Sequence, residues 1–146
     1  LLYAPTWRDV DEATSFFKHG GQIISELPSD WNLILKLHPL LQQRNPAEFY
    51  ALSGLAEKKS NLFLIDEFPP VYPILSLADV YLGDHSSVGY DFLSFNRPLF
   101  FLPTDTPGRL HACGTTIDLS NNIYRQFENP VHKDNTDLYR FAFTDC

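Results

Sequence analysis

Five short apolar runs that alternate with helix-like segments constrain the fold of this 146-residue chain more than any other feature. The apolar runs span residues 1–7, 31–39, 61–67, 80–83 and 97–103, and helices are predicted near 12–27, 46–58, 71–77 and 86–95. Strands that are apolar throughout and separated by helices indicate a parallel sheet with both faces covered. The pattern therefore predicts a Rossmann-like, doubly wound α/β domain with the strand order 3-2-1-4-5 and right-handed crossovers.

The length of the chain predicts one domain, because 146 residues are enough for a single hydrophobic core. We therefore expect residues 1–146 to form one domain. After Pro103 the pattern weakens, so residues 104–122 are predicted as a loop region and residues 129–146 as a terminal helix. The chain contains no Met and starts directly with an apolar strand, from which we expect a fragment of a longer protein.

Charge and cysteine content argue against several classes of partner and site. The formal net charge is −7 and there is no basic stripe, so a nucleic-acid partner is not expected. Cys113 and Cys146 are the only cysteines, which disfavours both a disulfide framework and a zinc site. No apolar run approaches the roughly 18 residues of a membrane span, and no signal peptide pattern is present. We expect reduced thiols, a cytoplasmic location and neither metal nor cofactor.

Three apolar runs end in unusual polar segments. The first ends at "PTWRD" (5–9), the second at "LHP" (37–39) and the fourth at "GDHSS" (83–87). In a doubly wound sheet, ligands bind at the carboxyl edge where the strand order reverses, between the first and fourth strands. These endings are therefore predicted to converge on a ligand site.

Two adjacent serines stand where a helix should begin after the fourth run. Ser86 or Ser87 alone would suffice as an N-cap, whose hydroxyl accepts a backbone N–H. Two serines beside the N–H groups of a helix start also predict a phosphate site. Asp91 lies one turn further on the same face, where its carboxylate would either bind a ribose diol or remain solvated.

Two further polar residues, His38 and Arg8, lie at the ends of the second and first apolar runs. His38 precedes Pro39, which fixes a turn, so its imidazole would contact a phosphate oxygen, give up a proton there, or bond to the backbone. Arg8 would contact a phosphate or carboxylate, or pair with Asp9 or Asp11 at the surface.

The remaining polar residues carry weaker predictions. His85 would point toward the site or away from it, and Asp84 would orient His85 or the loop. His19, His111 and His132 lack the spacing of metal ligands and are predicted to be structural or surface residues. The motifs GxGxxG, GxxxxGK[ST] and GxSxG are absent, which disfavours a dinucleotide site, a P-loop enzyme and a serine hydrolase.

Taken together, the motifs resemble those of a known family. The segments "YAPTWRD" (3–9), "LILKLHP" (33–39) and "LSLADVYLGDHSSVGYDFLSFNRPLFFL" (75–102) are similar in order and spacing to segments of the CDP-glycerol glycerophosphotransferase family of teichoic acid polymerases. Members carry a P-T-W-R segment, a strand that ends in His, and D-x-S-S-x-x-x-D ahead of an N-R-P turn. The resemblance covers about Leu1 to Thr104.

This resemblance implies the C-terminal, donor-binding domain of a two-domain GT-B transferase whose N-terminal domain lies outside the chain. His38, Ser86 and Ser87 would hold the pyrophosphate of a CDP-linked donor, and Asp91 would lie near the ribose. Glycerol phosphate, or a related alditol phosphate, would pass to a hydroxyl of a cell-surface polymer and CMP would leave. The general base would come from the missing domain, and the full-length protein would associate peripherally with the inner face of the plasma membrane. The site residues implied are Thr6, Arg8, His38, His85, Ser86, Ser87 and Asp91, with His38 as the catalytic one.

Two features depart from the family pattern. His85 stands where Tyr or another residue is usual, and the segment after Thr104 does not match the family's later acidic and Gly-Pro segments. The identity of the donor is therefore open. The alternatives are another GT-B transferase of the sialyltransferase or capsule polymer type, and a non-catalytic domain that binds a nucleotide or a partner. A nucleotide-sugar epimerase is disfavoured because it typically has glycines in place of Ser86 and Ser87.

Overall fold

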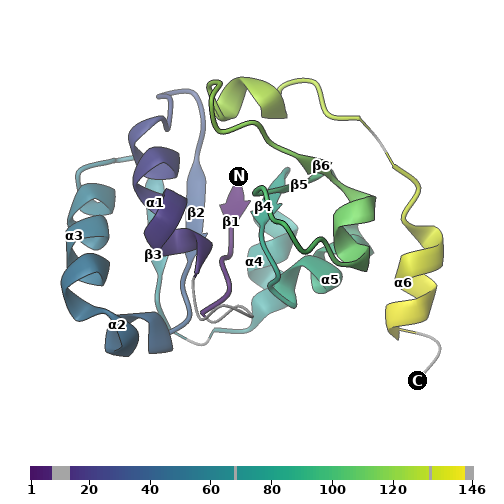
Figure 1. The fold of residues 1–146 in the computed structure, drawn as a ribbon, viewed down its shortest axis with the longest axis horizontal. Coiled ribbons are helices and arrows are strands. Elements are labelled where there is room, and N and C mark those ends of the chain that lie inside the picture. The colour runs from purple at the N-terminus through teal and green to yellow at the C-terminus, as the bar shows by residue number, and fades with distance from the viewer. Residues whose placement is uncertain (8–13, 68, 132, 144–146) are drawn as a thin grey trace.

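The computed structural model describes residues 1–7, 14–67, 69–131 and 133–143. Its centre is a six-stranded sheet, parallel throughout, with the order β3-β2-β1-β4-β5-β6 (Figure 1). The strands are β1 (Leu2–Tyr3), β2 (Leu33–Lys36), β3 (Leu62–Ile65), β4 (Tyr81–Gly83), β5 (Leu99–Phe101) and β6 (Thr115–Thr116). The predicted fold class and the predicted order of the first five strands are confirmed.

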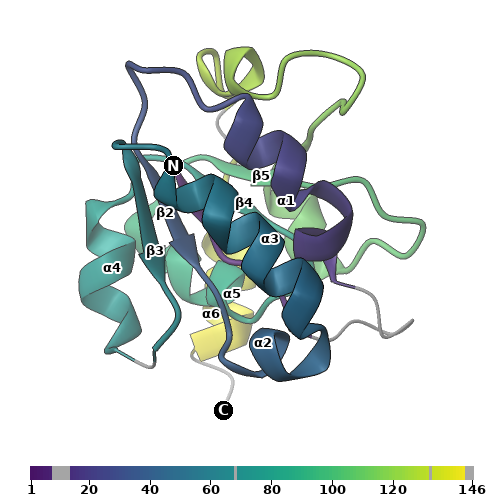
Figure 2. The ribbon, with the colours of Figure 1, turned by 90° about the vertical axis from the view of Figure 1, so that its left-hand side faces the viewer.

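Helices cover both faces of this sheet. They are α1 (Ser15–Ser25), α2 (Leu40–Arg44), α3 (Pro46–Glu57), α4 (Val71–Leu77), α5 (Val88–Phe92) and α6 (Thr136–Phe143), with short 3-10 helices η1 (Leu93–Phe95), η2 (Arg109–Cys113) and η3 (Tyr124–Phe127). Figure 2 views the sheet from its side, with α4 on one face and α1 and α3 on the other. Among the described residues, none of these helices combines the length and apolar character that crossing a bilayer requires.

Alternate residues of β1, β2, β4 and β5 enter different cores, because successive side chains point to opposite faces. Tyr3 packs with α1 and α3 in one apolar cluster, whereas Leu2 packs with α4 and α5 in the other. The same alternation separates Phe100 from Leu99 and Phe101 on β5. This two-sided burial explains why the strands read as continuous apolar runs in the sequence.

Local signals account for the helix starts. The N-cap of α3 is Asn45, whose side chain accepts the N–H of Glu48 at 3.3 Å, and Pro46 occupies the first helical position. Thr14 caps α1 and accepts the N–H of Phe16 at 3.3 Å. The predicted helix at 12–27 is shorter in the structure, and its first two residues lie outside the described ones.

The region after β5 differs from the prediction. Residues 104–122 were expected to form a loop, but they contain η2 and the sixth strand, β6, which pairs parallel with β5. The prediction was wrong because β6 has only two residues, too few to show a periodic pattern. The short helix α2 was also not predicted. Near the C-terminus α6 lies within the predicted helix at 129–146.

Candidate functional site

The carboxylate of Asp84 joins the ends of the first and fourth strands. Asp84 follows β4 directly and is only 8% exposed. The N–H of Thr6, beyond β1, donates to both carboxylate oxygens at 2.9 and 3.1 Å, and the N–H of Ser86 donates to Oδ1 at 3.1 Å. Because β1 and β4 are neighbours where the strand order reverses, this carboxylate ties together the two loops that form the switch point.

Helix α1 is attached to the same carboxylate. The hydroxyl of Ser15 donates to Asp84 Oδ2 at 2.5 Å and lies 2.8 Å from the hydroxyl of the fully buried Tyr3. The hydroxyl of Thr14 donates to the carbonyl of Thr6 at 2.6 Å. The first turn of α1 and the ends of two strands therefore form one hydrogen-bonded unit.

Burial sets the protonation behaviour of this unit. It raises the pKa of the Asp84 carboxyl above its ordinary value, while hydrogen bonds from Ser15, Thr6 and Ser86 act in the opposite direction. Burial first, and the nearby Asp84 second, also raise the pKa of Tyr3. The Tyr3 phenol therefore stays neutral beneath the carboxylate at physiological pH.

The two serines occupy different environments. Ser86 is 7% exposed, and its hydroxyl oxygen accepts the N–H of Val88 at 3.3 Å. Ser87 is exposed, and although it is the N-cap residue of α5, its side chain makes no capping hydrogen bond. The structural role that one serine can fill thus belongs to Ser86, and the Ser87 hydroxyl is presented at the surface.

Asp91 lies on α5 and faces α4. Its Oδ1 accepts a hydrogen bond from the hydroxyl of Tyr72 at 3.1 Å, and this bond raises the pKa of Tyr72. The carboxylate is half-buried. Asp91 is therefore positioned by a neighbouring helix instead of being only solvated.

His38 extends from β2 to the same edge of the sheet. Its Nδ1 accepts the N–H of Leu40 at 3.2 Å, and its ring stacks on Trp7 with the centroids 5.5 Å apart. Burial, and secondarily the charge of Lys36, lower the pKa of His38. The neutral ring carries its proton on Nε2 when Nδ1 is the acceptor, so the bond from Leu40 fixes which ring nitrogen of His38 is the N–H donor.

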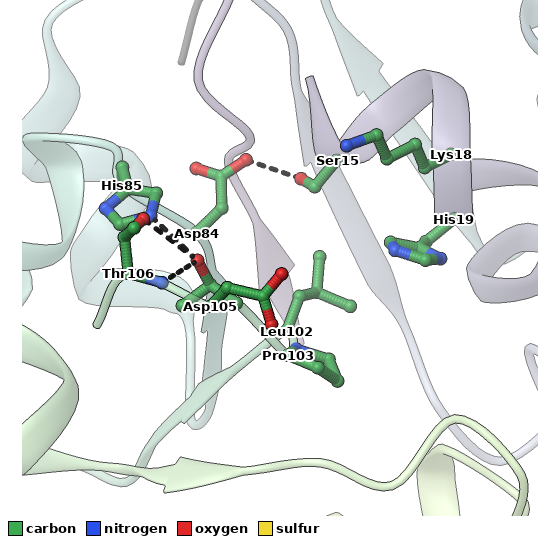
Figure 3. A pocket seen from close by; sticks show the side chains of 10 residues that line it. Ser15, Lys18, His19, Asp84, His85, Leu102, Pro103, Asp105 and Thr106 are labelled. Atoms are coloured by element: carbon green, nitrogen blue, oxygen red, sulfur yellow. Dashed lines mark hydrogen bonds between the residues drawn. The ribbon is translucent and has the colours of Figure 1, made fainter. Parts of the chain in front are cut away.

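His85 leaves the serine turn in another direction and lines a pocket of about 280 Å³. This pocket, called here the α1–β5 pocket, lies between the first turns of α1 and residues 102–106 after β5 (Figure 3). The Nε2 of His85 lies 3.2 Å from Thr104 Oγ1, and its ring centroid is 5.0 Å from that of His111. His85 therefore lies between this pocket and His111, whereas Asp91 faces α4.

The described strand endings lie close together, as the sequence predicted. The residue that joins them is Asp84, for which the sequence had predicted only a role in orienting His85 or the loop. Thr6 and Ser86 both donate backbone N–H groups to the Asp84 carboxylate. Trp7, which follows Thr6, stacks its ring on that of His38. The prediction for Arg8 falls on a residue outside the described ones, as does that for His132. The signal for Asp84 was available, because an acid directly after a buried strand needs hydrogen-bond donors.

Within the described residues, no cluster of three or more His, Cys, Asp or Glu side chains is arranged to hold a metal ion. No solved structure matches the chain significantly. The model of the family "CDP-Glycerol:Poly(glycerophosphate) glycerophosphotransferase" matches residues 1–140. That match extends well beyond Thr104, where the motif resemblance ended.

Three curated relatives illustrate the similarity. The teichoic acid glycerol-phosphate primase of Bacillus subtilis is 32% identical, over 87% of this chain and 35% of the relative. A teichoic acid poly(glycerol phosphate) polymerase of Bacillus spizizenii is 27% identical, over 72% of the chain and 26% of the relative. A teichoic acid ribitol-phosphate polymerase of Staphylococcus aureus is also 27% identical, over 72% of the chain and 18% of the relative. The chain thus spans about a third or less of the length of these relatives.

Proposed function

The chain belongs to the CDP-glycerol:poly(glycerophosphate) glycerophosphotransferase family, and from this premise we propose that it is the donor-binding domain of a GT-B transferase. The donor is a CDP-linked alditol phosphate, and the acceptor is a hydroxyl of a cell-surface polymer. The observation that carries the proposal is the Asp84 carboxylate, which holds together the ends of β1 and β4 at the ligand-binding position of a doubly wound sheet.

The proposed chemistry is displacement at the phosphorus that bears the alditol. The acceptor oxygen forms a bond to this phosphorus, the bond to the oxygen bridging the two phosphates breaks, and CMP leaves with the electron pair. The acceptor proton passes to a base that we place in the N-terminal domain of the longer protein. The chain by itself is then expected to bind the donor without turning it over, and the full-length protein to act at the inner face of the plasma membrane.

In this proposal the residues at the strand endings take different roles. The exposed Ser87 hydroxyl and the Nε2–H of His38 donate to the phosphates and stabilise the charge that develops on the leaving group. Asp91 binds the ribose diol from α5, with Tyr72 holding its carboxylate. Ser86 shapes the turn from inside, and Thr6 anchors the neighbouring loop. Contacts from Arg8 and His85 to the donor remain predictions.

Nucleotide binding tests the proposal directly. We expect CDP-glycerol, CMP and CDP to stabilise the chain more than UDP does in thermal shift measurements. Ser87→Ala is expected to weaken cytidine nucleotide binding by roughly tenfold, the effect of losing one hydrogen bond to a charged group. Stability should not change, because this side chain makes no capping hydrogen bond. Ser86→Ala should in addition lower the free energy of unfolding by about 1 kcal/mol, since it removes the acceptor for Val88.

The matched control for these variants is Ser60→Ala, which changes an exposed serine between α3 and β3. Its binding and stability should equal those of the unchanged chain. Equal responses to all four nucleotides, or a Ser87→Ala variant that binds as tightly as the control, would contradict the proposed function for this chain.

The pH dependence of binding reports on His38. In the free chain its pKa is lowered, whereas a bound phosphate dianion favours the protonated ring. Binding is then coupled to proton uptake, so CMP affinity should rise as the pH falls below about 6.5, the ordinary value for histidine. The phosphate itself begins to protonate near pH 6. The measurement is therefore the difference between the unchanged chain and His38→Gln in calorimetric titrations, and identical pH profiles would exclude proton uptake by His38 on binding.

A further inference from the structure

Tyr81 carries a buried hydroxyl to which the proposed chemistry gives no role. The residue is the first of β4 and is fully buried. Its hydroxyl oxygen has no hydrogen-bond partner among the described residues. Burying an unpaired hydroxyl destabilises a folded protein, whereas phenylalanine at the same position would carry no such cost. Packing alone therefore does not explain why this residue is a tyrosine.

The ring of Tyr81 is held in place by its neighbours. It stacks on Phe92 with the ring centroids 5.5 Å apart and meets the ring of Phe101 edge-on at 6.3 Å. Two glycines leave room for it, because a Cβ at Gly83 would strike the phenol and one at Gly89 would lie 3.3 Å from the hydroxyl oxygen. A ring packed in this way cannot turn to a distant partner. Any partner must come to the hydroxyl.

The hydroxyl lies beneath the turn at residues 84–87, called here the serine turn. Burial first, and the charge of Asp84 second, raise the pKa of Tyr81, with a smaller contribution from Asp91. The phenol therefore keeps its proton and can act as a donor. The hydroxyl of Ser86 acts on this pKa in the opposite direction, so it lies beside the phenol, although the two groups do not meet the geometry of a hydrogen bond. Ser86 is thus the partner within reach.

The Ser86 hydroxyl has the capacity for a further hydrogen bond. Its oxygen accepts the N–H of Val88 at 3.3 Å, a long bond, and a serine oxygen has two lone pairs. The next residue, Ser87, presents its hydroxyl at the surface. A phosphate held by Ser87 would also fix the peptide group between the two serines, and with it the direction of the Ser86 side chain. A ligand at the surface and the buried phenol are thereby linked through adjacent residues.

We propose that Tyr81 is a positioning residue whose hydroxyl donates to Ser86 Oγ only when a phosphate is held at Ser87. The unpaired phenol destabilises the free chain, and the new hydrogen bond stabilises the bound one. Ligand binding therefore gains from a group that does not stabilise the fold. The choice of a phosphate rests on the proposed function, whereas the unpaired hydroxyl beside Ser86 rests on the geometry.

Tyr81→Phe tests this role, because it removes the hydroxyl and keeps the ring. We expect the variant to be at least as stable as the unchanged chain, since it lacks the unpaired polar group. It should bind CMP and inorganic pyrophosphate about three- to tenfold more weakly, the effect of one hydrogen bond. Urea unfolding and calorimetric titration measure the two quantities. A purely structural residue would lose affinity only together with stability.

The matched control is Tyr124→Phe. Tyr124 is also buried, but it packs in the cluster on the other face of the sheet, and its hydroxyl donates to the carbonyl of Ile23 at 2.6 Å. This variant should lose stability and keep its affinity for both ligands, the reverse of Tyr81→Phe. In a double-mutant cycle, adding Tyr81→Phe to Ser86→Ala should weaken binding no further, because the proposed hydrogen bond is already absent.

Four results would overturn the inference. Tyr81→Phe could bind both ligands as tightly as the unchanged chain does, or it could lose stability and affinity together. The effects of Tyr81→Phe and Ser86→Ala on binding could add in the cycle, or the unchanged chain could bind neither ligand.

Pyrophosphate separates this inference from the proposed function. Binding of pyrophosphate that Tyr81→Phe weakens, together with no preference for cytidine over uridine nucleotides, would contradict the proposed function and support the role of Tyr81. A preference for cytidine nucleotides that Tyr81→Phe leaves at full affinity would support the proposed function and overturn the role of Tyr81.

Discussion

Replacing Asp84 with alanine is expected to lower the free energy of unfolding by about 3–5 kcal/mol, because several buried donors lose their acceptor at about 1–3 kcal/mol each. The substitution leaves the N–H groups of Thr6 and Ser86 and the hydroxyl of Ser15 without their acceptor. A domain of this size has about 5–15 kcal/mol of stability in total, so a large part of it would be lost. Urea unfolding followed by circular dichroism measures the change.

Two further variants make this prediction specific. Asp30→Ala changes an exposed acid after α1 and should alter stability by less than about 0.5 kcal/mol. Asp84→Asn keeps one acceptor oxygen but places an amide N–H₂ where donors already point, so its stability should be intermediate. If Asp84→Ala were as stable as Asp30→Ala, the carboxylate would not hold the strand ends together.

The Asp84 carboxyl also gives stability a pH dependence of definite sign. Because burial raises its pKa in the folded chain, the folded state binds this proton more readily than the unfolded state does. Its contribution is fully present below the unfolded value of about 3.9 and is lost as the pH rises through the raised folded value. Unfolding free energies measured between about pH 3.5 and 7 should therefore fall with pH more steeply for the unchanged chain than for Asp84→Asn. A steeper fall for Asp84→Asn would contradict the raised pKa.

Gly114→Ala is expected to destabilise the chain by about 1–3 kcal/mol or more, as overpacking of a core does. Gly114 directly precedes β6, and a Cβ there would lie 2.5 Å from the carbonyl oxygen of Leu99 and 2.5 Å from Cε2 of Phe101. The carbonyl belongs to the backbone of β5 and cannot turn aside. Thermal unfolding measures the effect.

The same substitution in another place should have the opposite sign. A Cβ at Gly54, within α3, would meet no atom within 4 Å. Gly54→Ala is therefore expected to stabilise the chain by about 0.5–1 kcal/mol, because alanine favours the helix more than glycine does. If both variants were destabilised equally, contact with β5 would not explain the effect at Gly114.

Much of the candidate site followed from the sequence because topology rules act on local patterns. Once apolar runs and helices alternate, the carboxyl ends of β1, β2 and β4 must share one edge of the sheet. That reasoning placed Thr6, His38 and Ser86 at the same edge. It did not reveal which side chains turn inward, and adjacent residues here do so differently: Ser86 is buried, whereas Ser87 is exposed.

The layered parallel sheet, the order of its first five strands and the position of the strand endings were determined by the sequence alone. They depend on periodicity and chain connectivity, which are local properties. Only the tertiary structure decided that Asp84 joins two loops, since Thr6 lies 78 residues away along the chain. It also decided that β6 exists and that His85 shares a pocket with α1, because both depend on contacts between segments distant in sequence. Such contacts leave no periodic trace in the residues that make them.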